Sequence, residues 1–160
     1  MLKRLLLSAA VMVSLVVPAY SQSKLTQEEA TKQVNDISST FQEAYNKHDA
    51  AGLTNLFTTD GVFVLGAGKV LKGQDEIKQF YVKYFDGPGK NASDFTPTVD
   101  EVRVLGDGAW AIGHTSVMAE GKEVKTHWAA TYRMGDGKLR AEMLSVGANA
   151  SNQNTPQGQK

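Results

Sequence analysis

The sequence predicts an α+β fold in which three helices come first and an antiparallel sheet follows. Residues 26–47 and 74–85 place apolar side chains at three- and four-residue steps, which is typical of amphipathic helices. Residues 97–147 instead read as short strands separated by glycine-containing turns, which is typical of an antiparallel meander. Helices followed by such a meander favour α+β rather than a parallel α/β fold.

The N-terminus has the layout of a secretory signal peptide, residues 1–21. Lys3 and Arg4 precede an apolar run of about 13 residues from Leu5 to Val17, and small residues stand three before and one before a cut after Ser21. The run is too short to span a bilayer comfortably, although an uncleaved anchor stays an alternative. We expect a bacterial protein that is periplasmic or secreted, with no membrane contact after cleavage.

Cleavage would leave one domain, residues 25–147, and a polar tail, residues 149–160, that is expected to be disordered. The full chain has 17 basic and 17 acidic residues, so losing Lys3 and Arg4 leaves 15 and 17. No block of like charge is present, and we expect no nucleic-acid partner. The absence of cysteine excludes thiolate catalysis and cysteine-based metal sites.

The helix starts are marked by capping residues. Thr26 and Glu29 fit a capping box, so a long first helix is expected from about Thr26. Asp49 is a good N-cap for a second, short helix because its carboxylate can accept from the first free amides. Asp60-Gly61 is expected to end that helix and turn into a strand. The apolar face of this second helix would be Leu53, Leu56 and Phe57.

The strands are predicted from turns. Residues 62–66 and 69–72 read as a hairpin around Gly-Ala-Gly, and a third helix begins at Gln74 or Asp75. A loop over 86–94 follows. The meander strands are expected near 97–106, 109–120, 123–134 and 138–147.

Several motifs in this order resemble one family. They are Tyr45-Asn46-x-x-Asp49, Leu53, Leu56-Phe57, Thr59-Asp60, Gly73-x-x-x-Ile77-x-x-Phe80-Tyr81, Gly108-Ala109-Trp110-Ala111, and Tyr132-Arg133 before Asp136-Gly137-Lys138. Together they resemble the nuclear transport factor 2-like superfamily, and within it the SnoaL-like group and its ketosteroid-isomerase relatives, over residues 28–147. The resemblance implies a cone: a curved sheet wraps an apolar pocket, the helices close it, and two subunits pair through the outer sheet face.

The pocket lining is predicted from strand alternation together with this resemblance. The residues Trp110, Ile112 and His114 share one face with Ser116 and Met118, and Trp128, Ala130 and Tyr132 share a face of the next strand; the resemblance puts both sets inward. The helices and first strand would add Phe41, Tyr45, Phe63, Leu65, Phe80 and Tyr81. Such an aromatic, mostly apolar cavity fits a small apolar or aromatic molecule.

The catalytic positions of ketosteroid isomerases, carried over by the resemblance, fall on Phe41, Leu65 and close to Ala130. None of these side chains can exchange a proton, so that mechanism is not expected. His114 is the candidate catalytic residue because it is the one expected inward group suited to acid–base work near neutral pH. Tyr45 or Tyr81 would be its partner; a core histidine tied to a hydroxyl is the alternative.

His127 is expected to point outward, opposite to His114, so no metal site and no cofactor are predicted. Three functions stay open. The first is an exported small-molecule binder without catalysis. The second is an isomerase, cyclase or dehydratase acting on a polyketide- or steroid-like ligand through His114. The third is a homo-oligomeric interaction module, dimeric through the outer sheet face.

Overall fold

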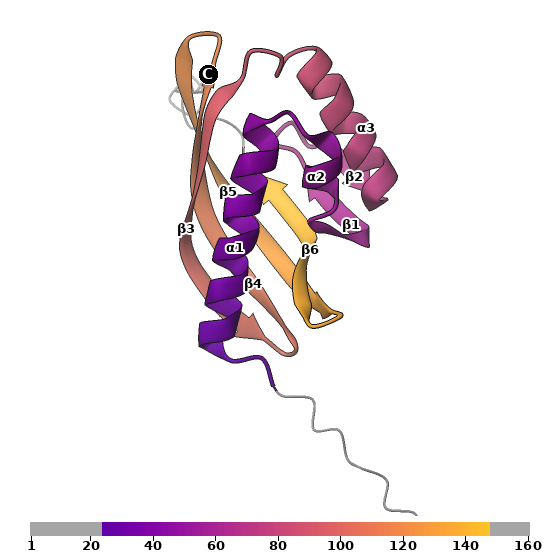
Figure 1. The fold of residues 1–160 in the computed structure, drawn as a ribbon, viewed down its shortest axis with the longest axis vertical. Helices are drawn as coiled ribbons and strands as arrows, with labels where there is room; N and C mark the ends of the chain where they lie inside the picture. The colour runs from indigo at the N-terminus through magenta and orange to yellow at the C-terminus, as the bar shows by residue number, and fades with distance from the viewer. Residues whose placement is uncertain (1–23, 148–160) are drawn as a thin grey trace, which may run out of the picture.

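The computed structural model describes residues 24–147. The predicted signal peptide, residues 1–21, and the predicted tail, residues 149–160, lie outside the described residues. Three helices cover the concave side of one curved sheet (Figure 1). They are α1 (Gln27–Asn46), α2 (Ala50–Thr54) and α3 (Gly73–Asp86). Within the described part of the chain, no helix is both long and apolar enough to cross a membrane.

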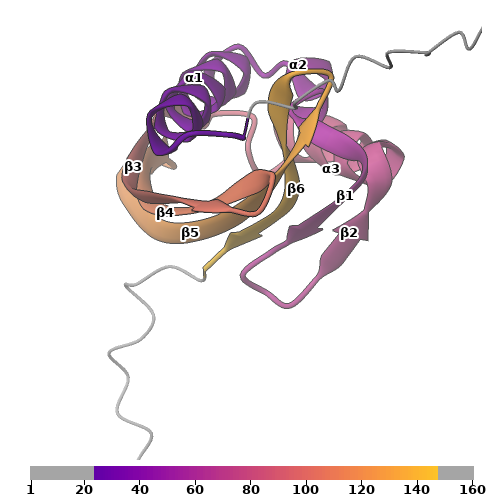
Figure 2. The same cartoon turned by 90° about the horizontal axis from the view of Figure 1, so that it is seen from below.

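A single sheet of six strands is ordered β2-β1-β6-β5-β4-β3. β1 and β6 pair in parallel, and every other neighbouring pair is antiparallel. Figure 2 shows the sheet curling around the helices without closing. The strands are β1 (Phe57–Val64), β2 (Val70–Lys72), β3 (Ser93–Leu105), β4 (Gly108–Ala119), β5 (Lys122–Gly135) and β6 (Lys138–Val146).

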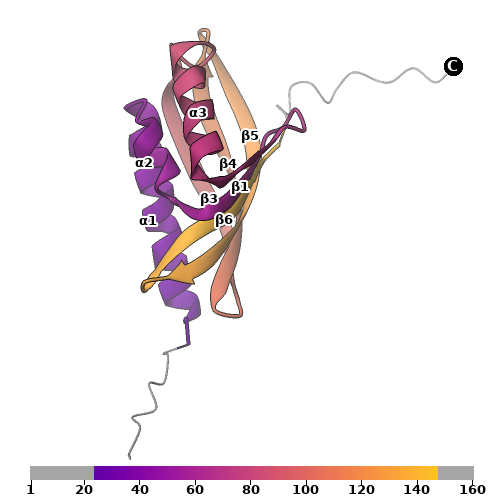
Figure 3. The ribbon, with the colours of Figure 1, turned by 90° about the vertical axis from the view of Figure 1, so that its right-hand side faces the viewer.

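The predicted α+β cone is confirmed. All three helices and the four-stranded meander are present, and the turns lie where glycines were expected to place them. α1 lies over β3 and β6, and α3 packs against β1 and β2 (Figure 3). The side chains between these layers form one buried core, which shapes the space that the helices leave over β4 and β5.

Both predicted helix caps are present. The Glu29 amide donates to Oγ1 of Thr26 at 3.2 Å, and the Thr26 amide donates to Oε2 of Glu29 at 3.0 Å, which completes the capping box. The Gly52 amide donates to Oδ1 of Asp49 at 2.9 Å. Asp49 is therefore a structural residue that starts α2.

His48 is also used by the fold. It adopts the left-handed region at φ 54°, which turns the chain sharply between α1 and α2. Its ring stacks on Phe85 at 4.5 Å between centroids, and Nε2 lies 3.1 Å from the Ala92 carbonyl oxygen.

The expected end of the second helix is wrong. α2 stops at Thr54 and β1 already begins at Phe57, so Asp60 lies within a strand. A short apolar run fits a helical and a strand period equally well, and here pairing with β6 decides. The Ala141 amide donates to the Leu56 carbonyl at 2.9 Å, which draws the chain into the sheet. Asp60 is exposed and bonds Nη2 of Arg133 on β5 at 2.6 Å.

Candidate ligand-binding cavity

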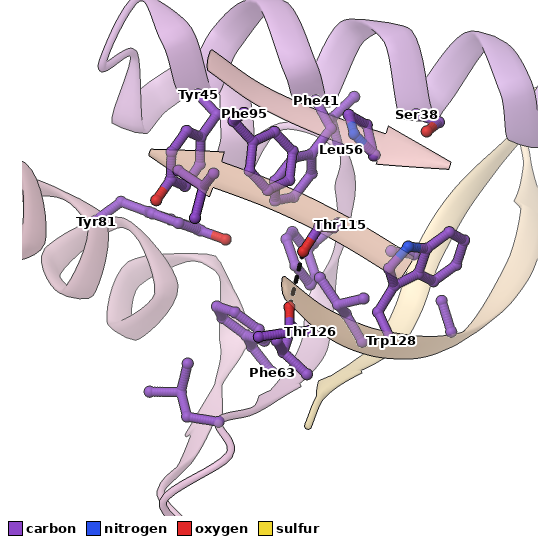
Figure 4. A pocket seen from close by; sticks show the side chains of 18 of the residues that line it. Ser38, Phe41, Tyr45, Leu56, Phe63, Tyr81, Phe95, Thr115, Thr126 and Trp128 are labelled. Carbon is purple, nitrogen blue, oxygen red and sulfur yellow. Dashed lines mark hydrogen bonds between the residues drawn. The ribbon is translucent and has the colours of Figure 1, made fainter. Parts of the chain in front are cut away.

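A cavity of about 390 Å³ lies between the helices and the concave sheet face. Aromatic side chains from α1 and α3 form one wall, and inward-facing residues of β3 to β6 form the other (Figure 4). Nine of the residues expected to bind a ligand line it: Phe41, Tyr45, Phe63, Leu65, Phe80, Tyr81, Trp128, Ala130 and Tyr132.

Sequence reasoning missed a second group of lining residues. They come from the inner faces of β3, β4, β5 and β6, and from the middle of α1. The main ones are Ile37, Ser38, Phe95, Thr115, Val117, Thr126, Leu144 and Val146. Several of them are small or polar, so their apolar patterning in the sequence is weak.

Polar groups in the cavity are few. Oγ1 of Thr115 and Oγ1 of Thr126 share a hydrogen bond of 2.7 Å across two strands. The Tyr81 hydroxyl points into the cavity toward this pair (Figure 4). The hydroxyls of Tyr45 and Tyr84 bond each other at 2.8 Å. Among the described residues that line the cavity, none is Asp, Glu, His, Lys or Arg.

The buried tyrosines stay protonated at neutral pH. Burial raises the pKa of the Tyr81 hydroxyl, and burial also raises the pKa of Tyr132. Burial, followed by the hydrogen bond to Tyr84, raises the pKa of Tyr45. These hydroxyls are therefore hydrogen-bond donors and acceptors rather than bases.

The expected inward face of β4 is wrong. In the register, Gly113 pairs with Trp128, and paired residues of neighbouring strands share a face. Trp128 faces the cavity, so the odd-numbered residues of β4 face it too. Trp110 and Ile112 instead lie on the outer face, where Ile112 is 40% exposed, and neither lines the cavity.

His114 is on that outer face as well. It is exposed, and its Nδ1 lies 3.0 Å and 3.1 Å from the two carboxylate oxygens of Asp100. The expectation that His114 points into the cavity is wrong, and the catalytic hypothesis loses its geometric basis. His127 pairs directly with His114, with ring centroids 6.4 Å apart. The expectation that these two histidines occupy opposite faces is therefore also wrong.

The positions that match the ketosteroid-isomerase acids remain at the cavity. Phe41, Leu65 and Ala130 all line it. The side chains at these three positions carry no exchangeable proton.

The model of the SnoaL-like domain family matches residues 39–142, more than half of the chain. The chain belongs to the SnoaL-like family. This SnoaL-like protein finds no match among curated proteins. Its family and its fold together suggest small-molecule binding or an isomerase-type function.

Solved structures share the fold of this SnoaL-like protein. A domain of unknown function with a cystatin-like fold from Nostoc punctiforme PCC 73102 is 21% identical, with a TM-score of 0.70, and the match covers 76% of this chain and 78% of that one. An NTF2-like protein of unknown function from Shewanella oneidensis MR-1 is 16% identical, with a TM-score of 0.66 and coverage of 74% and 98%. Aln2 from a Streptomyces species is 20% identical, with a TM-score of 0.66 and coverage of 78% and 94%.

Proposed function

We propose that this protein is an exported binder of a small, neutral, largely apolar molecule, and that the cavity is its binding site. The observation that carries the proposal is the lining: aromatic and aliphatic side chains enclose about 390 Å³, and none of the described lining residues is charged. Small-molecule sites of this make-up commonly measure about 300–1,000 Å³.

The uncharged, mostly apolar lining determines which class of ligand can bind. A charged group would lose its hydration without gaining a counter-charge, so an ionised ligand is disfavoured. The Tyr81 hydroxyl faces the cavity and can donate to one acceptor oxygen, and the Thr115–Thr126 pair offers a second polar contact. A compound with an aromatic or polycyclic body and one carbonyl or hydroxyl oxygen meets both conditions.

An entrance can be assigned from exposure. Leu65 at the end of β1, Val117 on β4 and Val124 on β5 line the cavity, yet each is only half-buried. Val117 and Val124 are paired residues close to the turn between β4 and β5. This hairpin lies at the top of Figure 1. An apolar ligand would enter there without crossing charged side chains of the lining.

Binding without turnover is favoured over catalysis. General acid–base work needs a group that exchanges protons near the working pH, and such groups are usually histidines or carboxylates. His114 lies on the far side of the sheet from the cavity, and burial raises the pKa of Tyr81 and Tyr45, which keeps these two hydroxyls protonated. The isomerase, cyclase or dehydratase hypothesis is therefore the weaker of the two.

Adjacent alanines on β5 provide the test. Ala130 is 3% exposed and lines the cavity, whereas Ala129 is exposed on the outer face. We would titrate the mature protein with N-phenyl-1-naphthylamine, a neutral apolar dye that fluoresces when it leaves water. Ala130→Leu fills cavity space and should weaken dye binding about tenfold or more, while Ala129→Leu should bind as the parent does.

Two results would overturn the proposal. One is the absence of saturable dye binding to the parent protein; the other is equal weakening by both leucine variants. Circular dichroism of each variant separates lost binding from lost folding.

We also propose that the outer face of the sheet joins two copies of the chain. Its exposed apolar side chains include Ile112 on β4, 40% exposed, and Met143 on β6, 38% exposed, with half-buried Trp110 beside them. Monomers seldom leave large apolar side chains gathered on one face, and a twofold pairing would cover both copies at once.

A further inference from the structure

The outer face of the sheet carries a cross-strand histidine pair. His114 on β4 and His127 on β5 are paired residues, so their side chains leave the same face side by side. Their ring centroids are 6.4 Å apart and the ring planes are inclined by 63°. The sequence contains three histidines, and the third, His48, stacks on Phe85 of α3 and contacts the Ala92 carbonyl.

Asp100 fixes one of these rings. Both carboxylate oxygens lie close to Nδ1 of His114, at 3.0 Å and 3.1 Å. An ionised carboxylate only accepts hydrogen bonds, so Nδ1 must carry the hydrogen. In the neutral imidazole the lone pair is then on Nε2, on the side of the ring away from Asp100.

Asp100 lies at a bulge in β3. Thr98 pairs with His114 and Glu101 pairs with Ile112, so the register shifts between Val99 and Glu101 and leaves Asp100 as the extra residue. Such bulges re-aim a side chain and are common beside functional sites.

We propose that His114 and His127 bind one divalent transition-metal ion, with Asp100 as the partner that orients the first imidazole. A histidine that binds a metal through one nitrogen donates its other N–H to a carboxylate, a backbone carbonyl or a water, and Asp100 is such a carboxylate for His114. Imidazoles suit Zn²⁺, Cu²⁺ and Ni²⁺.

The spacing of the rings fits this role. Two imidazoles bound to one tetrahedral ion, each through a nitrogen at about 2.1 Å, hold their centroids roughly 5–6 Å apart. The observed 6.4 Å needs only a small rotation of two exposed side chains. The backbone needs no change, because the pairing of β4 with β5 already sets the two histidines opposite each other.

Two imidazoles leave coordination positions open. The described residues hold no group of three or more His, Cys, Asp or Glu side chains placed around one ion. Water would fill the remaining positions in a single chain. Where two copies pair through this face, the partner's histidines could fill them instead, and the ion would then tie the two chains together. The site faces away from the cavity and does not depend on the ligand proposed there.

The test is calorimetric titration of Zn²⁺ and Cu²⁺ into the tag-free mature protein after treatment with a chelator. We expect ion binding to saturate at one ion per chain or at one ion per two chains. In the second case, sedimentation should show that adding the ion doubles the mass of the particle. His114→Ala and His127→Ala should each weaken binding about tenfold or more, and Asp100→Asn, at the positioning residue, should weaken it less. Lys125→Ala, exposed two residues before His127 on β5, is the matched control and should leave binding unchanged.

Electron paramagnetic resonance of the Cu²⁺ form supplies a second readout. Two directly bound imidazole nitrogens should be seen in the parent protein and one in His127→Ala. The proposal is overturned if neither ion binds, if binding survives unchanged in His127→Ala, or if the Cu²⁺ spectrum shows no nitrogen ligands.

Discussion

Gly113 lies directly opposite Trp128, and a Cβ added at Gly113 would fall 2.5 Å from the indole ring. The indole therefore occupies the space that a side chain at residue 113 would need. Because Gly113 and Trp128 face the cavity together, the odd-numbered face of β4 is the inner one. Trp110, Ile112 and His114 therefore lie on the other side of the sheet.

Gly113→Val should push the indole out of its position and disturb the pairing of β3 with β4, because the added Cβ also meets the carbonyl oxygen of Thr98. Overpacking costs about 1–3 kcal/mol of the free energy of unfolding, and a clash with backbone should place this variant at or above the upper end. Urea denaturation followed by circular dichroism measures the loss. Ile112→Val, one residue along but on the outer face, should change the free energy of unfolding by no more than about 0.5 kcal/mol. Equal losses in the two variants would contradict the register.

Tyr81→Phe tests the polar anchor in the cavity. The variant keeps the aromatic wall and removes one hydroxyl, and a typical hydrogen bond contributes about 0.5–1.5 kcal/mol. Affinity for an apolar ligand that carries one oxygen should fall by roughly 2- to 13-fold. Affinity for the hydrocarbon of the same shape that lacks the oxygen should not change. Isothermal titration with such a ligand pair provides the measurement. An equal fall for both ligands would mean that the hydroxyl does not act as the anchor.

Asp49→Ala removes a helix cap and Asp60→Ala removes a surface ion pair, so the two variants compare how much each contributes to stability. The loss of the Asp49 cap on α2 should cost about 1 kcal/mol of stability. Asp60 accepts a hydrogen bond from Arg133 at 2.6 Å but is exposed, and solvent screening leaves such surface pairs little net contribution to stability. Thermal unfolding of the two variants should therefore show the larger shift for Asp49→Ala. The reverse order would assign the main structural role to Asp60.

Ile112→Lys should prevent pairing of two chains through the outer face. A charge placed in the middle of a covered apolar patch leaves an ammonium without its water or a partner. Sedimentation analysis should find the parent as a dimer and the variant as a monomer. Val82→Lys is the control, because Val82 is 44% exposed on α3, away from the outer face. A parent protein that sediments as a monomer would rule out the pairing.

The order of elements could be predicted from the sequence because its signals are local. Thr26 and Asp49 mark helix starts with capping side chains, and glycine turns delimit the meander strands. The family resemblance then supplied the cone. The boundary near Asp60 could not be found this way, because pairing between β1 and β6, far apart in the chain, decides it.

The cavity lining was predicted correctly on the helices, β1 and β5 but not on β4. The family resemblance placed the face of Trp110 and Ile112 inward, whereas the inner face carries Gly113 and Thr115. The signal was present: counting outward from the Glu120-Gly121 turn puts Gly113 opposite Trp128. The β3 bulge at Asp100 carries no such signal, and the link from Asp100 to His114 needed the structure.

The central claim is that the cavity holds a small apolar molecule, and native mass spectrometry of the mature protein purified from its own source tests it most directly. We predict a stoichiometric adduct of a neutral, oxygen-bearing compound that is present in the parent and in Ala129→Leu and is lost in Ala130→Leu. Protein that carries no adduct and acquires none from a panel of neutral aromatic compounds, with Ala129→Leu and Ala130→Leu indistinguishable, would contradict it.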